Sequence, residues 1–133
     1  MIPKITTATV RAGLNAACPP CEKLECVIYC KLSSGSIPLD SAPCFAGITD
    51  QGTLLTICFS PEEKPDVRYI PLLSLKKVRI IGAFSRYLVK LTFFFSHIQH
   101  ECSLLISATP HGITLPYQPE QAEKFVERLR ALS

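Results

Sequence analysis

Two groups of residues in this chain have the types and spacing that redox or metal chemistry uses. The first is Cys18-Pro19-Pro20-Cys21, two thiols separated by two residues. Such a pair works as a redox site at a helix N-terminus after a strand, where a thiolate is stabilised. Here the pair precedes a strand-like segment. We therefore interpret it as a proline-stiffened entry to a sheet, with half of a zinc site and a redox pair as the disfavoured alternatives.

The second group is His97, His100 and Cys102, which could converge across a turn. Their spacing matches no closed zinc pattern, and histidines in turns are more often solvated. The sequence also contains no nucleophile-elbow, Gly-rich phosphate-loop or H-E-x-x-H motif. We therefore expect no bound metal, no cofactor and no enzymatic activity.

Basic residues form the densest cluster of one charge, which we call the basic patch: Lys76, Lys77, Arg79, Arg86 and Lys90. Lys77 and Arg79 share one face of a predicted strand, and Arg86 and Lys90 share one face of the next. If these strands pair, four charges point outward together. Such a patch would attract an anionic surface or an acidic partner, and a solvated sheet face is an equally common interpretation.

Composition narrows the class of protein. The chain has 133 residues and a net charge of +3, from 14 basic and 11 acidic residues, which does not indicate nucleic-acid binding. No signal peptide and no apolar run of about 18 residues is present, so we expect a cytoplasmic protein. The seven cysteines are then free thiols. We expect Cys26, Cys30, Cys58 and Cys102 to be reduced and mostly buried.

Alternating hydrophobicity predicts the strands that must position these residues. A half-buried strand is expected over 24–32, a hairpin over 44–60 with its turn at 50–52, and two short strands or one bent strand over 67–81. Further strands are expected over 86–95 and 101–109, with a turn over 96–100. The tail changes to a helical period after Pro119, with one apolar stripe: Ala122, Phe125, Val126, Leu129 and Leu132.

The predicted fold class is therefore α+β: a bent antiparallel sheet or barrel of about seven strands, capped by a C-terminal amphipathic helix. We expect residues 1–21 to form a lead-in segment, partly helical, and residues 22–133 to form the domain.

The order of elements resembles the pleckstrin-homology superfold, especially its GRAM-like branch. Ile48 to Leu54 looks like the segment I-T-x-x-G-x-L of such domains, and Ile70 to Val78 looks like I-P-L-x-x-I-x-x-V, with Leu75 in place of the second Ile. The resemblance covers roughly residues 22–132. It implies a barrel plugged by the last helix, in which Phe125 takes the place of the usual Trp.

Two functions remain open. Many such domains bind phosphoinositides through basic residues in and around the loop after the first strand, but here the segment 33–49 contains no Lys or Arg. We therefore favour an intracellular module that docks a protein partner, through a sheet edge or the groove beside the helix. The alternative is a peripheral membrane module that binds anionic lipid or phosphoinositide through the basic patch.

Overall fold

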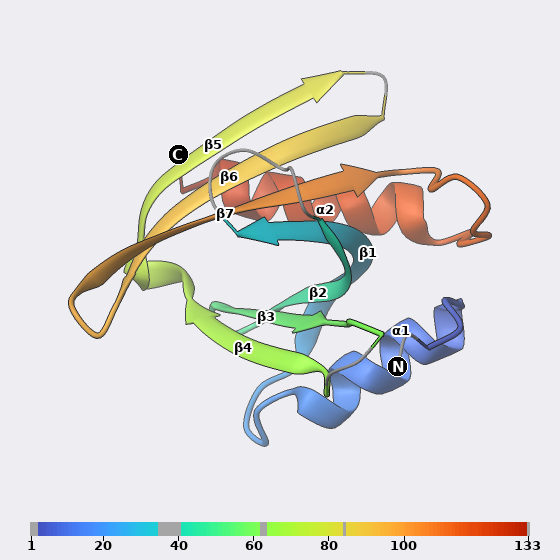
Figure 1. Ribbon diagram of the computed structural model, residues 1–133, viewed down its shortest axis with the longest axis horizontal. Helices are drawn as coiled ribbons and strands as arrows, with labels where there is room; N and C mark the ends of the chain where they lie inside the picture. The colour runs from blue at the N-terminus through green and yellow to red at the C-terminus, as the bar shows by residue number, and fades with distance from the viewer. Residues whose placement is uncertain (1–2, 35–40, 62–63, 84, 133) are drawn as a thin grey trace.

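The computed structural model describes residues 3–34, 41–61, 64–83 and 85–132, and shows seven strands between two helices (Figure 1). The elements are α1 (Thr7–Ala17), β1 (Leu24–Ser34), β2 (Ala42–Thr49), β3 (Thr53–Cys58), β4 (Asp66–Pro71), the 3-10 turn η1 (Leu72–Ser74), β5 (Leu75–Ala83), β6 (Arg86–Phe95), β7 (Ile98–Ser107) and α2 (Gln118–Arg130).

The strands form one curled antiparallel sheet in the order β4-β3-β2-β1-β7-β6-β5. Every neighbouring pair is antiparallel. This confirms the predicted α+β class and the terminal helix. It also places β4, with Pro71 at its end, on an edge of the sheet, as expected for a strand that a proline terminates.

The inner face of the sheet packs against α2. Phe125 and Leu129 are fully buried there, beside Ile28, Leu54 and Leu104 from three strands. The amphipathic stripe is thus confirmed from Ala122 to Leu129, whereas Leu132 lies beyond the end of α2 and is exposed. We call this the inner core.

The outer face of the sheet is covered by α1 mainly over β1, β2 and β3, and the Tyr69 hydroxyl of β4 donates a hydrogen bond to the Ala17 carbonyl at the end of α1, at 2.7 Å. Val10 and Leu14 of α1 are fully buried against Tyr29, Phe45 and Leu55, which defines an outer core. Thr6 and Thr9 form a capping box that begins the helix. We expected β1 to be half-buried; instead residues 26–30 are buried on both faces, because α1 covers the second one.

Two turns show how local sequence fixes the hairpins. Gly52, with φ +80°, closes the β2–β3 turn at the predicted place. The β6–β7 turn is shorter than the predicted 96–100, because Ser96 and His97 both adopt positive φ and close a two-residue loop. The hairpin therefore extends past the inner core, and Phe95 at its end is 66% exposed.

The strands β1 and β7 pair from Lys31 to Ser34, and they are separated on the side of Tyr29 and Ser107. Gln118 of α2 fills the gap. Its amide oxygen accepts a hydrogen bond from Tyr29 N–H at 3.1 Å, and its amide nitrogen donates to the carbonyls of Tyr29 (2.7 Å) and Ser107 (3.1 Å). A buried side chain thus satisfies backbone groups that a continuous ladder would have paired.

Candidate functional site

The basic patch assembles on one side of the β5–β6 hairpin. Arg79 lies opposite Lys90 and Lys77 lies opposite Thr92, which places Lys77, Arg79, Lys90 and Arg86 on the outer face of the sheet. The two strands therefore pair, which is the condition under which the four charges were expected to point outward together. Like charges opposite each other destabilise a sheet, so the placement of Arg79 beside Lys90 costs folding free energy.

Lys76 lies at the end of this patch. It falls at the β-bulge between Leu75 and Lys77, and its Nζ lies 5.1 Å from the centroid of the Phe94 ring. A cation over an aromatic face is held by the ring quadrupole. Lys76 is therefore fixed near the β6–β7 hairpin, and the structure brings all five predicted residues to one region of the sheet.

Lys31 is a sixth cation on this face, although we did not include it among the site residues. It lies opposite Leu105 on β7, on the same face of β1 as Tyr29. The alternation of β1 places Lys31 outward, but only the β1–β7 register shows that it joins β7, β6 and β5.

A small hollow of about 240 Å³ lies in the patch, lined by Lys77, Arg79 and Lys90, and Glu101 is the one acid among the described residues that line it. In the described part of the chain, no salt bridge joins Lys31 or a patch residue to an acid. The face therefore carries a net positive field on strands whose geometry is fixed.

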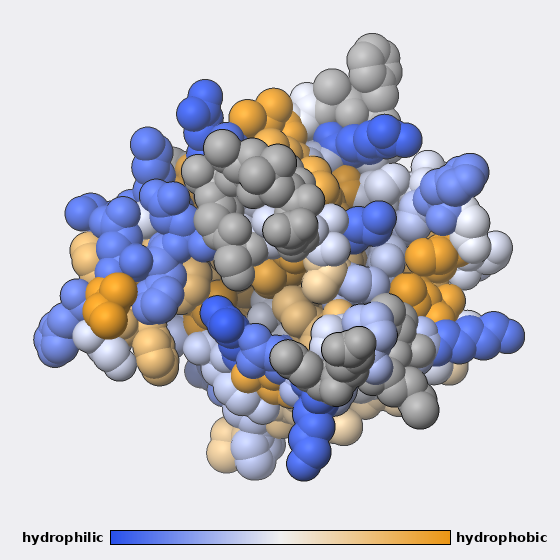
Figure 2. Space-filling view, in the orientation of Figure 1, coloured by the Kyte–Doolittle hydropathy of each residue, from blue (hydrophilic) through white to orange (hydrophobic). Residues whose placement is uncertain are grey.

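Aromatic and aliphatic side chains gather at a second place, between the β4 edge and the β6–β7 hairpin. A groove of about 620 Å³ lies there, lined by Tyr69, Ile70, Phe93 and Phe95 among others. Ile98 at the hairpin is 61% exposed, and hydrophobic atoms show at the left of Figure 2 where this hairpin projects. Exposed apolar side chains beside a groove are typical of interaction sites.

The cysteines form a row that their spacing in the sequence did not reveal. Cys30 lies opposite Cys44, and Cys44 lies opposite Cys58, on three neighbouring strands. All seven cysteines are free thiols; Cys26, Cys30 and Cys102 are buried as predicted, while Cys58 is partly exposed. Their reduced state in the cell stays a prediction.

Four thiols, those of Cys26, Cys44, Cys58 and Cys102, are poorly suited to nucleophilic chemistry. Burial raises the pKa of Cys26 and of Cys102 to about 11. The pKa of Cys44 is raised by its hydrogen bond with the Cys30 thiol and by burial. The pKa of Cys58 is raised by its hydrogen bond with Cys44 and by burial. Thiols with raised pKa values are weak nucleophiles at neutral pH.

The Cys18–Cys21 pair and the His97, His100 and Cys102 group, which the sequence suggested for redox or metal chemistry, lie on different elements. Cys18 is the C-cap of α1, not the start of a helix, and desolvation together with Glu22 and Asp50 raises its pKa. The His100 ring stacks on the Phe93 ring, with 5.6 Å between the ring centroids. His97 lies in the β6–β7 turn. Among the described residues, no three His, Cys, Asp or Glu side chains are placed to hold a metal ion.

Comparisons with known proteins bear on the fold alone. No protein-family model matches the chain, and the search of curated proteins found no match. Within the described residues, no helix has the length and apolar character to cross a membrane. One solved structure is similar: the hSac2 domain from the human phosphoinositide phosphatase Sac2, with a TM-score of 0.55 and 10% sequence identity, over 95% of this chain and 76% of that chain.

Proposed function

We propose that this chain is a non-enzymatic, pleckstrin-homology-like module that attaches to anionic membrane surfaces through the outer face of β1, β7, β6 and β5. The observation that carries the proposal is the register of β5 and β6, which gathers Lys77, Arg79, Lys90 and Arg86 on a face that α1 leaves uncovered. The raised pKa values of the buried thiols support a role in binding rather than thiol catalysis.

The expected strength of attachment follows from the charges. Each Lys or Arg near an anionic membrane contributes about 1 kcal/mol, so the six cations of this face, less the opposing charge of Glu101, contribute roughly 5 kcal/mol. That corresponds to a dissociation constant of a few tenths of a millimolar, weak and sensitive to salt. The absence of Lys and Arg over 33–49 argues against a tight headgroup pocket at the usual place in such folds. The likeness to a domain of a phosphoinositide phosphatase makes phosphoinositide vesicles a natural first probe.

Co-sedimentation with vesicles tests this function. The unmodified chain should sediment with phosphatidylcholine vesicles that contain phosphatidylserine or phosphoinositide, and should stay in solution with phosphatidylcholine alone. The triple variant Lys77→Glu, Arg79→Glu, Lys90→Glu should lose attachment. The matched control is Lys4→Glu, Lys23→Glu, Lys64→Glu, which changes the net charge equally at exposed residues off this face. If the control loses as much attachment as the triple variant, net charge and not this face explains the binding.

Protein docking, the function that we favoured from the sequence, is the second candidate. The groove beside the β4 edge supports it, because an edge strand can pair with an extended chain while Phe94 and Phe95 contact alternate side chains. A random-peptide library selected on the chain should then yield extended apolar peptides that shift the amide NMR signals of β4. Peptides that bind equally well to the Phe95→Asp variant would not support this site.

A further inference from the structure

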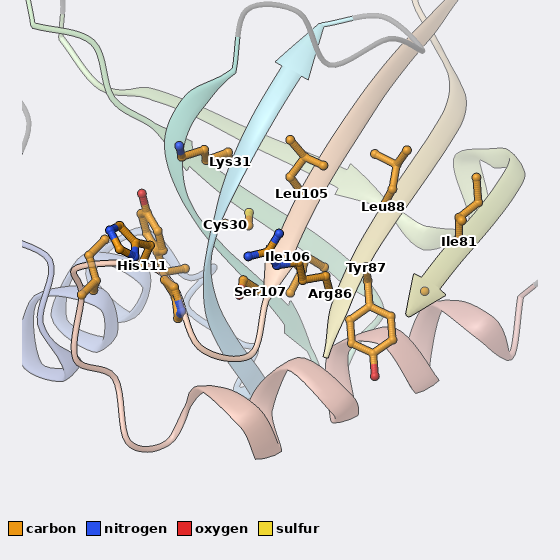
Figure 3. A pocket seen from close by; sticks show the side chains of 14 residues that line it. Cys30, Lys31, Ile81, Arg86, Tyr87, Leu88, Leu105, Ile106, Ser107 and His111 are labelled. Carbon is orange, nitrogen blue, oxygen red and sulfur yellow. The ribbon is translucent and has the colours of Figure 1, made fainter. Parts of the chain in front are cut away.

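A groove of about 580 Å³ opens on the outer face where β1 and β7 separate (Figure 3). It lies at the boundary of the outer core: Tyr29 and Ile113 belong both to that core and to the wall of the groove. The strands β5 and β6 form its opposite side. Its volume is within the range of roughly 300–1,000 Å³ that is typical of small-molecule sites.

The floor of the groove is a row of apolar side chains in register across three strands. Leu105 lies opposite Leu88, and Leu88 lies opposite Ile81. Figure 3 shows these three side chains pointing to the same side of the sheet, with Lys31 at the β1 end of the row. Ile81 is 48% exposed, and Leu88 and Leu105 are partly exposed. An apolar ligand lying along this row would remove their exposed surface from water.

The charged side chains among the described lining residues of the groove are basic. Lys31, Arg86 and His111 line it, and no aspartate or glutamate is among its described lining residues. Within the described residues, neither Lys31 nor Arg86 forms a salt bridge. An apolar floor with unneutralised cations at its rim complements a ligand that is itself divided into an apolar part and an anion.

We propose that this groove binds a single-chain lipid anion, with the acyl chain along Ile81, Leu88 and Leu105 and the carboxylate or phosphate headgroup between Lys31 and Arg86. The groove shares Lys31 and Arg86 with the membrane face proposed above. It differs from that face in taking one lipid molecule and in using contacts with the acyl chain as well as charge.

Titration with monomeric ligands tests the site. The probes are laurate, a lysophosphatidic acid and a lysophosphatidylcholine of the same chain length, all below their micelle concentrations, and inorganic phosphate. Calorimetry should show binding of laurate or lysophosphatidic acid, or of both, and at least tenfold weaker binding of the other two. The stronger of the two anions identifies the headgroup. Each methylene removed from the chain should weaken binding about fourfold, the factor expected for a buried CH₂.

Variants separate this site from the membrane face. Leu105→Trp should fill the groove and reduce lipid-anion binding at least tenfold, while vesicle attachment is kept. Ile98→Trp is the matched control, at an exposed position of the same strand outside the groove. Lys31→Gln should weaken binding of the anion and should leave the folded state intact, because Lys31 is exposed.

The triple variant of Lys77, Arg79 and Lys90 should still bind the monomeric lipid anion, because none of these residues lines the groove. Loss of vesicle attachment with retained lipid-anion binding would mean that the two sites are separate. Equal binding of the neutral lysophosphatidylcholine, or unchanged binding by Leu105→Trp, would overturn the proposal for the groove without affecting the proposal for the membrane.

Discussion

The two halves of the outer sheet face differ although they belong to one continuous sheet. Over β1, β2 and β3, which we call the covered half, the outward side chains include Tyr29, Phe45 and Leu55, and α1 packs on them. Over β7, β6 and β5, the bare half, the outward side chains include Lys77, Arg79 and Lys90. The inner core behind both halves is shared. The outward residues of one half therefore stabilise the fold, while those of the other are available for binding.

The largest expected effect comes from removing a contact of the covered half. Leu14→Ala should lower the free energy of unfolding by about 2–5 kcal/mol, because a fully buried side chain leaves a cavity under α1. Leu88→Ala, the matched change in the bare half, should cost about 1 kcal/mol or less, because Leu88 is partly exposed. Urea denaturation of both variants measures the two losses. Equal losses would show that the two halves do not differ in their contribution to stability.

A smaller loss of stability is expected from replacing Gln118, which bridges β1 and β7 where the two halves join. Gln118→Leu should cost about 1–3 kcal/mol, because it leaves the N–H and C=O of Tyr29 and the carbonyl of Ser107 without their partner. Gln121→Leu is the control, since Gln121 accepts a single bond, from Val27 N–H at 3.0 Å, and is partly exposed. Hydrogen exchange at Tyr29 should accelerate in the first variant. Unchanged exchange would mean that water replaces the amide without loss.

The smallest expected effect is a loss of folding stability at alkaline pH. Folding raises the pKa of Cys26 and Cys102 from 9.0 to about 11, so the folded chain holds more protons than the unfolded chain in this range. Their contribution to stability is complete below about pH 9 and is lost as the pH rises from there towards about 11. By about pH 9.5 the free energy of unfolding should fall by on the order of 1 kcal/mol.

Thermal unfolding as a function of pH measures this loss, and variants locate its source. The double variant Cys26→Ala, Cys102→Ala should show a smaller decline than the unmodified chain. Leu88→Ala, in the bare half, should show the same decline as the unmodified chain. A decline that the double variant keeps in full would place the responsible groups elsewhere, with Cys44 and Cys58, whose pKa values are also raised, as the next residues to replace.

Local periodicity was sufficient to predict most of the fold. Alternation located β6 and β7, the turn at Gly52 defined the β2–β3 hairpin, and the stripe through Phe125 identified α2. The role of α1 was missed, because Val10 and Leu14 alone make too short a stripe to show which face they cover. Whether a strand is buried on one face or on two depends on which other segments pack on it, here α1. The alternation within β1 does not show this, so β1 was expected to be only half-buried.

The site was predictable to a similar extent. The spacing of Lys77, Arg79, Arg86 and Lys90 showed which residues share a face of each strand, and the register of β5 and β6 then brought them together. The contribution of Lys31 was not predictable, because it depends on the pairing of β1 with β7, two strands far apart in the sequence. The cysteine row likewise depends on the registers of β1, β2 and β3.

The strand β1 belongs to both halves of the outer face, since Tyr29 lies in the outer core and Lys31, two residues later, lies in the groove. This limits how the chain can change in length. One residue inserted between Tyr29 and Lys31 would turn Lys31 towards the inner core and an apolar neighbour outward, because a shift of one residue reverses every later side chain of a strand. The same insertion in the turn at 19–23 would leave the alternation of β1 unchanged, so length variation is tolerable before this strand and not within it.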